Sequence, residues 1–239
     1  MIRRSIKAGL RRLGLSIHRL EAHHEAELHL AMKIAEYGAG TLFDVGANIG
    51  QFAQGMRKRG YRGRIVSFEP LQACHAALER AAHGDAGWIV APRMALGAAA
   101  AEADILVAEN MVSSSLLPVF DNSVHAAPQS RQVGREPVAV CRLDEVVDPA
   151  WDGPYALKID TQGFERAVLE GAAGVLDRTC LVLLEMSLTP LYEGGAGFAD
   201  LYKYMEGHGF RCIGLSPGFA DLALREQLQA DALFVRTNP

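Results

Sequence analysis

The sequence predicts an α/β fold: a doubly wound, mostly parallel sheet with an antiparallel edge hairpin and N-terminal helices. Three observations lead to this prediction. Short apolar runs alternate with helix-like patterns, the first run ends in a glycine-rich turn, and the last two runs lie too close together for a long intervening helix. Strand–helix–strand units of this kind have right-handed crossovers, which keep successive strands parallel.

The expected elements are short and follow one another closely. Strands are expected at about 41–46, 64–68, 87–91, 103–108, 137–140, 155–160, 180–186, 210–215 and 231–236. Helices are expected at about 26–37, 49–59, 70–82, 164–170 and 198–208. The last two strands should pair antiparallel, through a loop that contains Pro217 and Gly218.

Composition narrows the class of protein. The 239 residues are 49% hydrophobic and 22% charged, which is typical of a globular enzyme. The four cysteines form no Cys-x-x-Cys pair, which favours buried thiols in a reducing compartment over a zinc site. No apolar run approaches the roughly 18 residues that span a bilayer, and no secretory signal is recognisable. We therefore expect a cytoplasmic protein.

The charge is unevenly distributed. Residues 1–20 carry six basic residues and no acid, whereas the whole chain has a net charge of −4. The acidic remainder argues against nucleic acid as a partner. Residues 1–20 also form a helical pattern with one apolar and one basic face. We favour a helix packed on its own domain, because Gly9 and Gly14 weaken a free helix; the alternative is peripheral contact with the inner membrane surface or with a partner.

Two regions follow from these patterns. Residues 1–37 are expected to form an N-terminal helical segment, and residues 38–239 the main domain. The sequence assigns no oligomeric state.

The turn after the first strand is the first candidate binding element. It reads Asp44-Val-Gly46-Ala-Asn48-Ile-Gly50, and in a doubly wound sheet this turn faces the ligand. It lacks the later glycines of the dinucleotide fingerprint and the lysine of a P-loop. Asn48 tolerates a positive φ where glycine is more usual. Asp44 would repel a pyrophosphate but suits a ligand that carries an amino group.

An acidic residue also ends the second strand. Glu69 lies 19 residues after Gly50, where an acid can accept hydrogen bonds from both ribose hydroxyls of an adenosine group. Pro70 follows it, in a position that suits the first turn of a helix. Together with Asp44, these residues indicate S-adenosylmethionine, which has an amino acid tail in place of phosphates.

A second cluster lies in the segment 155–172. Asp160 ends a buried strand and should face the same crevice as Asp44 and Glu69. Lys158 is expected to pair with an acid on the face of the sheet, and Glu165 lies in the first turn of a helix, where the dipole favours an anion. The alternative is a helix-capping Asp160 with Glu165 as a surface charge.

Four stretches resemble the FkbM family of S-adenosylmethionine-dependent methyltransferases: FDVGANIGQF, SFEP, LKIDTQGFERAVLEGA and LVLLEMS. The resemblance covers roughly residues 40–236 and implies a class I methyltransferase, Rossmann-like fold. It also implies methylation of a hydroxyl, often on a sugar, glycolipid or polyketide. Asp160 and Glu165 match the family pattern, whereas Thr161-Gln162 departs from it, so the resemblance assigns Gln162 no catalytic role.

Three residues are candidates for the base that takes the hydroxyl proton. Asp160 is the first, Glu185 at the end of the next strand is the second, and His125 in a polar loop is the third. Asp160 and Glu185 could instead hold a divalent cation. That alternative is not favoured, and no His- or Cys-rich ligand set supports a transition metal.

The long polar stretch over residues 110–135 is expected to be a lid or an acceptor-binding segment, with a plain surface loop as the alternative. Asp144, after it, is expected to cap a short helix. The predicted function is O-methylation of a small-molecule or glycan acceptor. The alternatives are a non-catalytic adenosine-ligand-binding or scaffold module, and a dinucleotide or nucleotide-sugar oxidoreductase, against which the missing glycines argue.

Overall fold

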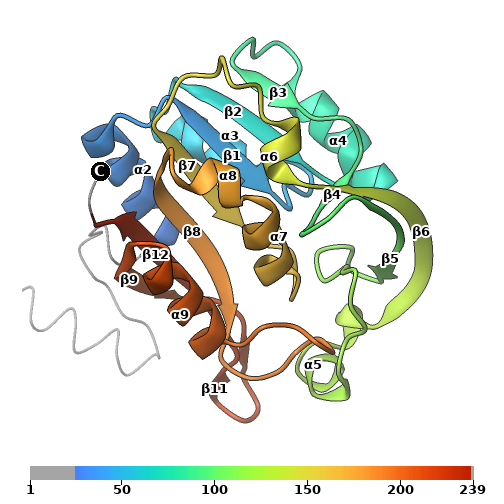
Figure 1. Cartoon of the computed structure of the whole chain (residues 1–239). Helices are drawn as coiled ribbons and strands as arrows, with labels where there is room; N and C mark the ends of the chain where they lie inside the picture. Colours follow the sequence, from blue (N-terminus) through green and yellow to red (C-terminus); the bar gives the residue numbers. More distant parts are fainter. Residues whose placement is uncertain (1–24, 238–239) are drawn as a thin grey trace, which may run out of the picture.

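The computed structural model describes residues 25–237 and is built on a seven-stranded sheet (Figure 1). The helix expected at residues 1–20 lies outside this range. The strands are β1 (Thr41–Val45), β2 (Arg64–Phe68), β3 (Trp88–Val90), β7 (Tyr155–Ile159), β8 (Thr179–Ser187), β9 (Phe210–Pro217) and β12 (Gln229–Arg236). Their order is β3-β2-β1-β7-β8-β12-β9. Within this sheet, β12 is the one strand that runs opposite to the others, and it pairs antiparallel with β8 and with the edge strand β9. The predicted antiparallel edge hairpin is therefore confirmed.

Helices cover both faces of this sheet. They are α2 (Ala26–Tyr37), α3 (Gln51–Lys58), α4 (Gln72–Ala82), α6 (Leu143–Val146), α7 (Glu165–Gly171), α8 (Ala173–Leu176) and α9 (Phe198–Gly207). All five residues of β1 are buried. Leu42 packs into the core cluster with α2 and α3, and Phe43 into the cluster with α7, α8 and α9. Strands covered on both faces read as continuous apolar runs, and the burial of each large apolar side chain contributes roughly 1.5–3 kcal/mol.

A smaller sheet stands beside the main one. It consists of β4 (Ala95–Leu96), β6 (Gln132–Cys141) and β5 (Ala101–Ala108), in that order. The strand expected at 137–140 begins earlier because residues 132–136 pair with β5 while much of that stretch remains exposed to solvent. Between β5 and β6 the polar stretch contains α5 (Asp121–Ala126) and a 3-10 turn, η2 (Pro128–Ser130). It is therefore a structured segment.

Two local expectations are corrected. Pro70 does not lie in the first turn of α4, which begins at Gln72 after an extended Leu71. Asp144 lies inside α6 and does not cap it. Its carboxylate accepts a hydrogen bond from the N–H of Gly174 in α8 (3.2 Å) and pairs with Arg142 (2.6 Å).

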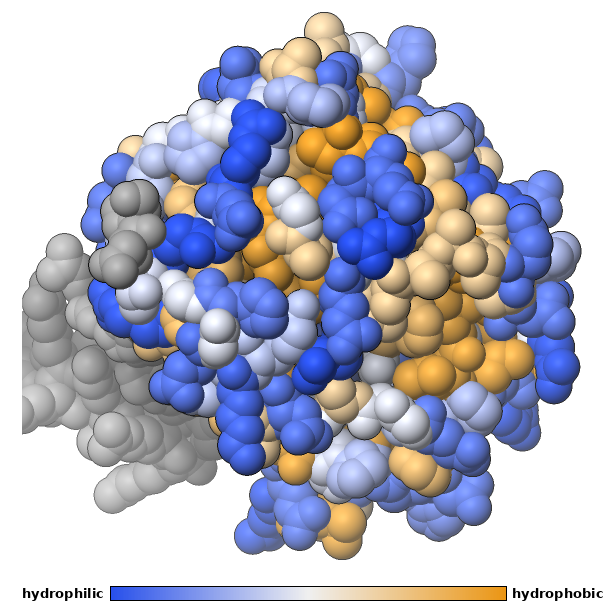
Figure 2. Space-filling view, viewed as in Figure 1, coloured by the Kyte–Doolittle hydropathy of each residue, from blue (hydrophilic) through white to orange (hydrophobic). Residues whose placement is uncertain are grey.

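Figure 2 shows the surface of the face that is seen in Figure 1. Polar and apolar residues are mixed on this face, and apolar residues gather near β5 and β6. Between β9 and β12 the chain forms a minor hairpin of β10 (Ala220–Asp221) and β11 (Glu226–Gln227). Among residues 25–237, no helix has the length and apolarity required to cross a bilayer.

Candidate active site

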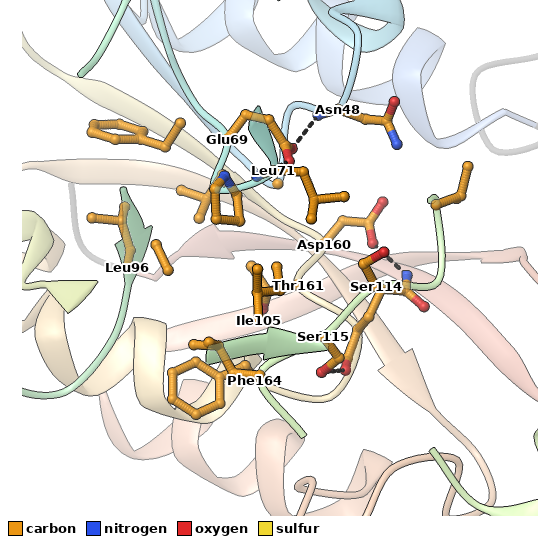
Figure 3. Close-up of a pocket in the computed structure, with 18 of the residues that line it drawn as sticks. Asn48, Glu69, Leu71, Leu96, Ile105, Ser114, Ser115, Asp160, Thr161 and Phe164 are labelled. Atoms are coloured by element: carbon orange, nitrogen blue, oxygen red, sulfur yellow. Dashed lines mark hydrogen bonds between the residues drawn. The ribbon is translucent and has the colours of Figure 1, made fainter. Parts of the chain in front are cut away.

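A pocket opens where β1, β2 and β7 end (Figure 3). Gly46, Asn48, Glu69, Pro70 and Asp160 line it. None of the described residues around it is Lys, Arg or His, so its two charged groups are both carboxylates. We call this pocket the crevice.

The turn after β1 has the predicted backbone geometry. Gly46, Asn48 and Gly50 have φ angles of 75°, 49° and 90°, which confirms that Asn48 occupies a left-handed position. A Cβ on Gly46 would collide with the carbonyl group of Asp160, so only glycine lets this turn meet the end of β7.

The amides of the turn are already occupied. The N–H groups of residues 46 and 47 donate to the carbonyl oxygen of Phe68, and that of Gly50 donates to Ala47. The N–H of Asn48 donates to Glu69, and that of Ile49 to the Asn48 side chain. All five N–H groups from residue 46 to residue 50 thus have an acceptor within the protein.

Glu69 joins the turn to the end of β2 and faces the crevice (Figure 3). Its Oε2 accepts the N–H of Asn48 at 2.7 Å and its Oε1 accepts the N–H of Leu71 at 2.9 Å. Burial raises the pKa of Glu69 to about 6. Each carboxylate oxygen can accept a further hydrogen bond, so this side chain is fixed and still able to bind hydroxyl groups.

Asp44 does not line the crevice, contrary to the expectation. Its side chain is fully buried, with Oδ1 at 3.2 Å from Nζ of Lys158 and Oδ2 accepting the hydroxyl of Ser67 at 3.3 Å. The ammonium group that it binds is therefore that of Lys158. Burial raises the pKa of Asp44, and Lys158 opposes that shift. The expected pairing of Lys158 with an acid on the sheet face is confirmed.

Lys158 also supports the turn. Its Nζ donates to the carbonyl oxygen of Gly46 at 2.9 Å and lies 3.7 Å from Oδ2 of Asp160. Burial alone would lower the pKa of Lys158, but the charges of Asp44 and Asp160 outweigh it and raise that pKa. The ammonium thus remains charged and ties β1 to β7 beneath the crevice.

Gln162 connects two of the candidate bases. Its Nε2 donates to Oδ1 of Asp160 and to Oε2 of Glu185, each at 2.7 Å, and its Oε1 accepts the hydroxyl of Tyr192 at 2.8 Å. Burial, and then the charge of Asp160, raise the pKa of Glu185 well above its usual value. The alternative with a divalent cation required the metal to lie between Asp160 and Glu185, and the side-chain amide of Gln162 lies between them instead. Sequence reasoning set Gln162 aside; its position two residues after Asp160 is the signal in the sequence that could have identified it. In the structure it lies in the turn after β7 with a φ of 55°.

Glu165 supports the same turn after β7 through hydrogen bonds to its backbone. It is buried, so the alternative in which Glu165 is a surface charge is wrong. It is 3% exposed, and its Oε1 accepts the N–H groups of Thr161 (2.9 Å) and Gly163 (3.0 Å). Burial raises the pKa of Glu165 to about 7. Its role in the structure is to fix the backbone that carries Gln162.

His125 does not belong to the site. It is exposed on α5, its Nδ1 lies 3.3 Å from the carbonyl oxygen of Asp121, and it does not line the crevice. The structure therefore gives no support to His125 as a base, because α5 directs it to solvent. Within residues 25–237, no group of three His, Cys, Asp or Glu side chains is placed to hold a metal ion.

Comparisons with known proteins were made for the sequence and for the fold. Residues 44–212 match the model of the methyltransferase FkbM domain. An rRNA methylase from Streptococcus thermophilus is similar in structure (TM-score 0.51, 10% identity, 92% of this chain and 99% of that one). A proposed O-methyltransferase from Klebsiella pneumoniae gives a TM-score of 0.50 at 11% identity over 98% and 89% of the two chains. A proposed tRNA (m1A22) methyltransferase from Streptococcus pneumoniae, in complex with S-adenosylmethionine, gives 0.47 at 13% over 89% and 72%.

These identities show a shared fold alone. No curated protein matches the sequence.

Proposed function

The chain belongs to the FkbM methyltransferase family and has the class I methyltransferase fold; from that premise we propose that it transfers a methyl group from S-adenosylmethionine to a hydroxyl oxygen of a small-molecule or glycan acceptor. Bound in the crevice, S-adenosylmethionine supplies an electrophilic methyl group on a sulfonium, whose sulfur keeps the electron pair of the broken C–S bond as a thioether.

The observation that carries this proposal is the charge of the crevice. Glu69 and Asp160 line it, and none of its described lining residues is basic. The N–H groups of residues 46–50 all have acceptors within the protein. A pyrophosphate would therefore meet two carboxylates and none of these amides, whereas a sulfonium with an ammonium group is attracted. This supports S-adenosylmethionine over a dinucleotide and argues against the oxidoreductase alternative.

Each residue around the crevice has a definite part in this proposal. Glu69 accepts the ribose hydroxyls, and the turn Gly46–Gly50, with Asn48 at its centre, packs along the adenosine group. Pro70 forms part of the adenine wall. Asp44 acts through Lys158, which holds the carbonyl oxygen of Gly46.

Asp160 is the proposed base. It lines the crevice, and its Oδ1 is held by Gln162 at 2.7 Å. Its carboxylate takes the proton of the acceptor hydroxyl as the C–O bond forms, a contribution of roughly 10²–10⁴ in rate. Alignment of methyl group and acceptor supplies a further large effective molarity. Glu185, with its raised pKa, is retained as a partner of Gln162 and as the second candidate.

The acceptor is proposed to be a small molecule or glycan because a nucleic acid needs cationic contacts to phosphate. The crevice lining contains no such side chain. The similar rRNA methylase makes RNA the acceptor to exclude by experiment.

A thermal-shift experiment tests the proposal. S-adenosylhomocysteine at a hundred times its dissociation constant should stabilise the native state by about 2.7 kcal/mol, a rise of roughly 5–10 °C for a domain of this size. NAD at the same concentration should give no shift. Either a shift with NAD or none with S-adenosylhomocysteine would contradict the proposed cofactor. The first result would favour the oxidoreductase alternative, and the second would favour a scaffold module.

A further inference from the structure

A second cavity, with a volume of about 250 Å³, adjoins the crevice. Gln162 and Val112 line both, so the amide that holds Asp160 forms part of the wall between them. A molecule in the second cavity would therefore lie next to the proposed base and to the methyl end of the crevice.

The walls of this cavity come from segments far apart in the chain. Asn110 to Ser130 supply one side, Glu185 of β8 and Tyr192 supply another, and Phe219 and Gln229 close it. In Figure 1, α5 lies beside the chain that follows β8. Three hydrogen bonds fasten these segments: Phe120 N–H and Ser123 Oγ both donate to the carbonyl oxygen of Leu191 (2.9 Å each), and Glu193 N–H donates to that of Pro118 (2.8 Å). The cavity is thus already formed.

One polar group in this cavity has no partner in the described structure. Ser130 is 4% exposed, and its Oγ makes no hydrogen bond. Leaving a buried polar group unsatisfied costs about 1–3 kcal/mol, so such groups call for an explanation. Ser123, equally buried in the same cavity, has its hydroxyl bonded within the protein. The difference between these two serines indicates that Ser130 is matched by a ligand.

The remaining lining is polar but without cations. None of the described residues that line this cavity is Lys, Arg or His, and Glu185 is the one residue among them with an ionisable carboxyl group. Oε2 of Glu185 accepts the amides of Gln162 and Gln229 at 2.7 Å each, whereas its Oε1 accepts no hydrogen bond from the described residues. Side-chain amides and hydroxyls can exchange hydrogen bonds with alcohol groups, and Leu191 and Phe219 offer an apolar surface to the carbon skeleton. A phosphate would find no positive partner.

We propose that this second cavity binds the methyl acceptor, and that the part of the acceptor it holds is an uncharged, polyhydroxylated ring without phosphate. This rests on the proposed function, because it places the acceptor next to Asp160. It goes further in naming the site and in excluding phosphorylated sugars and RNA from it.

The test compares Ser130 with Glu79, an exposed residue outside both cavities. Labelled S-adenosylmethionine is supplied with methyl glycosides of glucose, rhamnose and fucose, with glucose 6-phosphate and with a short RNA. The wild type should methylate an uncharged glycoside and neither phosphate-bearing probe. Ser130→Ala should raise the KM for that glycoside roughly 5–10-fold, the equivalent of one hydrogen bond, with kcat nearly unchanged. Glu79→Gln, exposed on α4 and outside both cavities, should leave the KM unchanged.

A blocking variant and a binding measurement complete the design. Ala127→Phe should fill the cavity and abolish turnover, and all three variants should keep the S-adenosylhomocysteine melting shift, which shows that they fold. Unchanged KM values in both Ser130→Ala and Ala127→Phe, or preference for glucose 6-phosphate, would overturn the acceptor site while leaving the proposed function intact. So would the absence of both turnover and saturation-transfer NMR signals for every glycoside in protein that binds S-adenosylhomocysteine. Preference for RNA would overturn both the acceptor site and the proposed small-molecule or glycan acceptor. Loss of the wild-type melting shift would instead remove the proposed function.

Discussion

Lys158 and Asp44 are register partners on the adjacent parallel strands β7 and β1, and their side chains form an ion pair of 3.2 Å within the buried sheet. The same ammonium holds the carbonyl oxygens of Val45 and Gly46. A pair of this kind is costly to break, because the charge left behind is buried and unmatched. It links the strand that carries Asp160 to the turn that carries Asn48.

Lys158→Met should therefore lower the free energy of unfolding by about 3–5 kcal/mol. The double variant Asp44→Leu with Lys158→Met should recover much of that loss, since no buried charge remains. Urea denaturation with an unchanged m-value measures both. Lys33→Met is the control: its surface pair with Glu36 should be worth less than about 1 kcal/mol. A double variant no more stable than Lys158→Met would contradict this account.

Glu69→Gln should weaken S-adenosylhomocysteine binding about 10–100-fold, because hydrogen bonds to a charged group contribute about 1.5–3 kcal/mol. Glu69→Ala should abolish the melting shift. Isothermal titration calorimetry measures the affinity. The control is Glu79→Gln: Glu79 is exposed to solvent on α4, so this substitution should leave the affinity unchanged. Equal affinity in Glu69→Gln and wild type would remove Glu69 from the cofactor site.

The pKa of about 6 at Glu69 also predicts how binding depends on pH. The ionised carboxylate is the better acceptor for ribose hydroxyls, so affinity should fall as the pH is lowered through about 6. Titrations at pH 5, 6, 7 and 8 measure this. Glu69→Gln should flatten the profile; a profile unchanged by that substitution would assign it to another group.

Asp160→Asn should lower kcat about 10²–10⁴-fold, while the affinity for S-adenosylhomocysteine, which carries no sulfonium charge, stays near that of the wild type. Asparagine keeps an Oδ1 that can accept the amide of Gln162, so the shape of the site is preserved and the base is lost. Asp160→Ala should likewise keep the melting shift and lose turnover. Asp200→Asn, exposed on α9, is the control. Normal turnover in Asp160→Asn would exclude it as the base.

Glu165 should show a separate effect on stability. Its pKa is about 7 in the native state against 4.5 for the ordinary group, so between these values the native state keeps a proton that the unfolded state has lost. This group's contribution to stability is then full below pH 4.5 and decreases as the pH rises to about 7, by about 3 kcal/mol at most.

Glu165→Gln should match the wild type at pH 4.5 and exceed it in stability at pH 8, because its Oε1 can still accept the N–H groups of Thr161 and Gly163. Glu165→Ala leaves both N–H groups without an acceptor and should lose about 1–3 kcal/mol for each at every pH. Thermal denaturation across pH measures both. If the stability of Glu165→Gln depended on pH as that of the wild type does, ionisation of Glu165 would not destabilise the native state, which would contradict this prediction.

The main sheet is predictable from the sequence because both of its faces are covered. β1, β2 and β7 appear as continuous apolar runs, and their observed ends lie within one residue of the expected ones. β6 was predicted in part only, since its first half is largely exposed and has no apolar pattern. The short β4 and α5 were missed for a similar reason: two to six residues carry too little periodicity to identify them.

The site residues that could be predicted are those whose location follows from their position at the end of one strand. Glu69 and Asp160 follow the ends of β2 and β7, and both line the crevice. The position of Asp44 depends on its register partner 114 residues away, which no local pattern reveals. Gln162 was missed because its contacts with Asp160, Glu185 and Tyr192 are made across three separate segments.

The segment between β5 and β6 lines both cavities: residues 111–116 contribute to the crevice, whereas residues 123–130 contribute to the second cavity alone. Evolution could thus rewrite residues 121–130, in length or in sequence, without changing the lining of the crevice. Exchange of residues 121–130 between relatives should accordingly change the choice of acceptor, which makes this segment the natural place to begin engineering new acceptors.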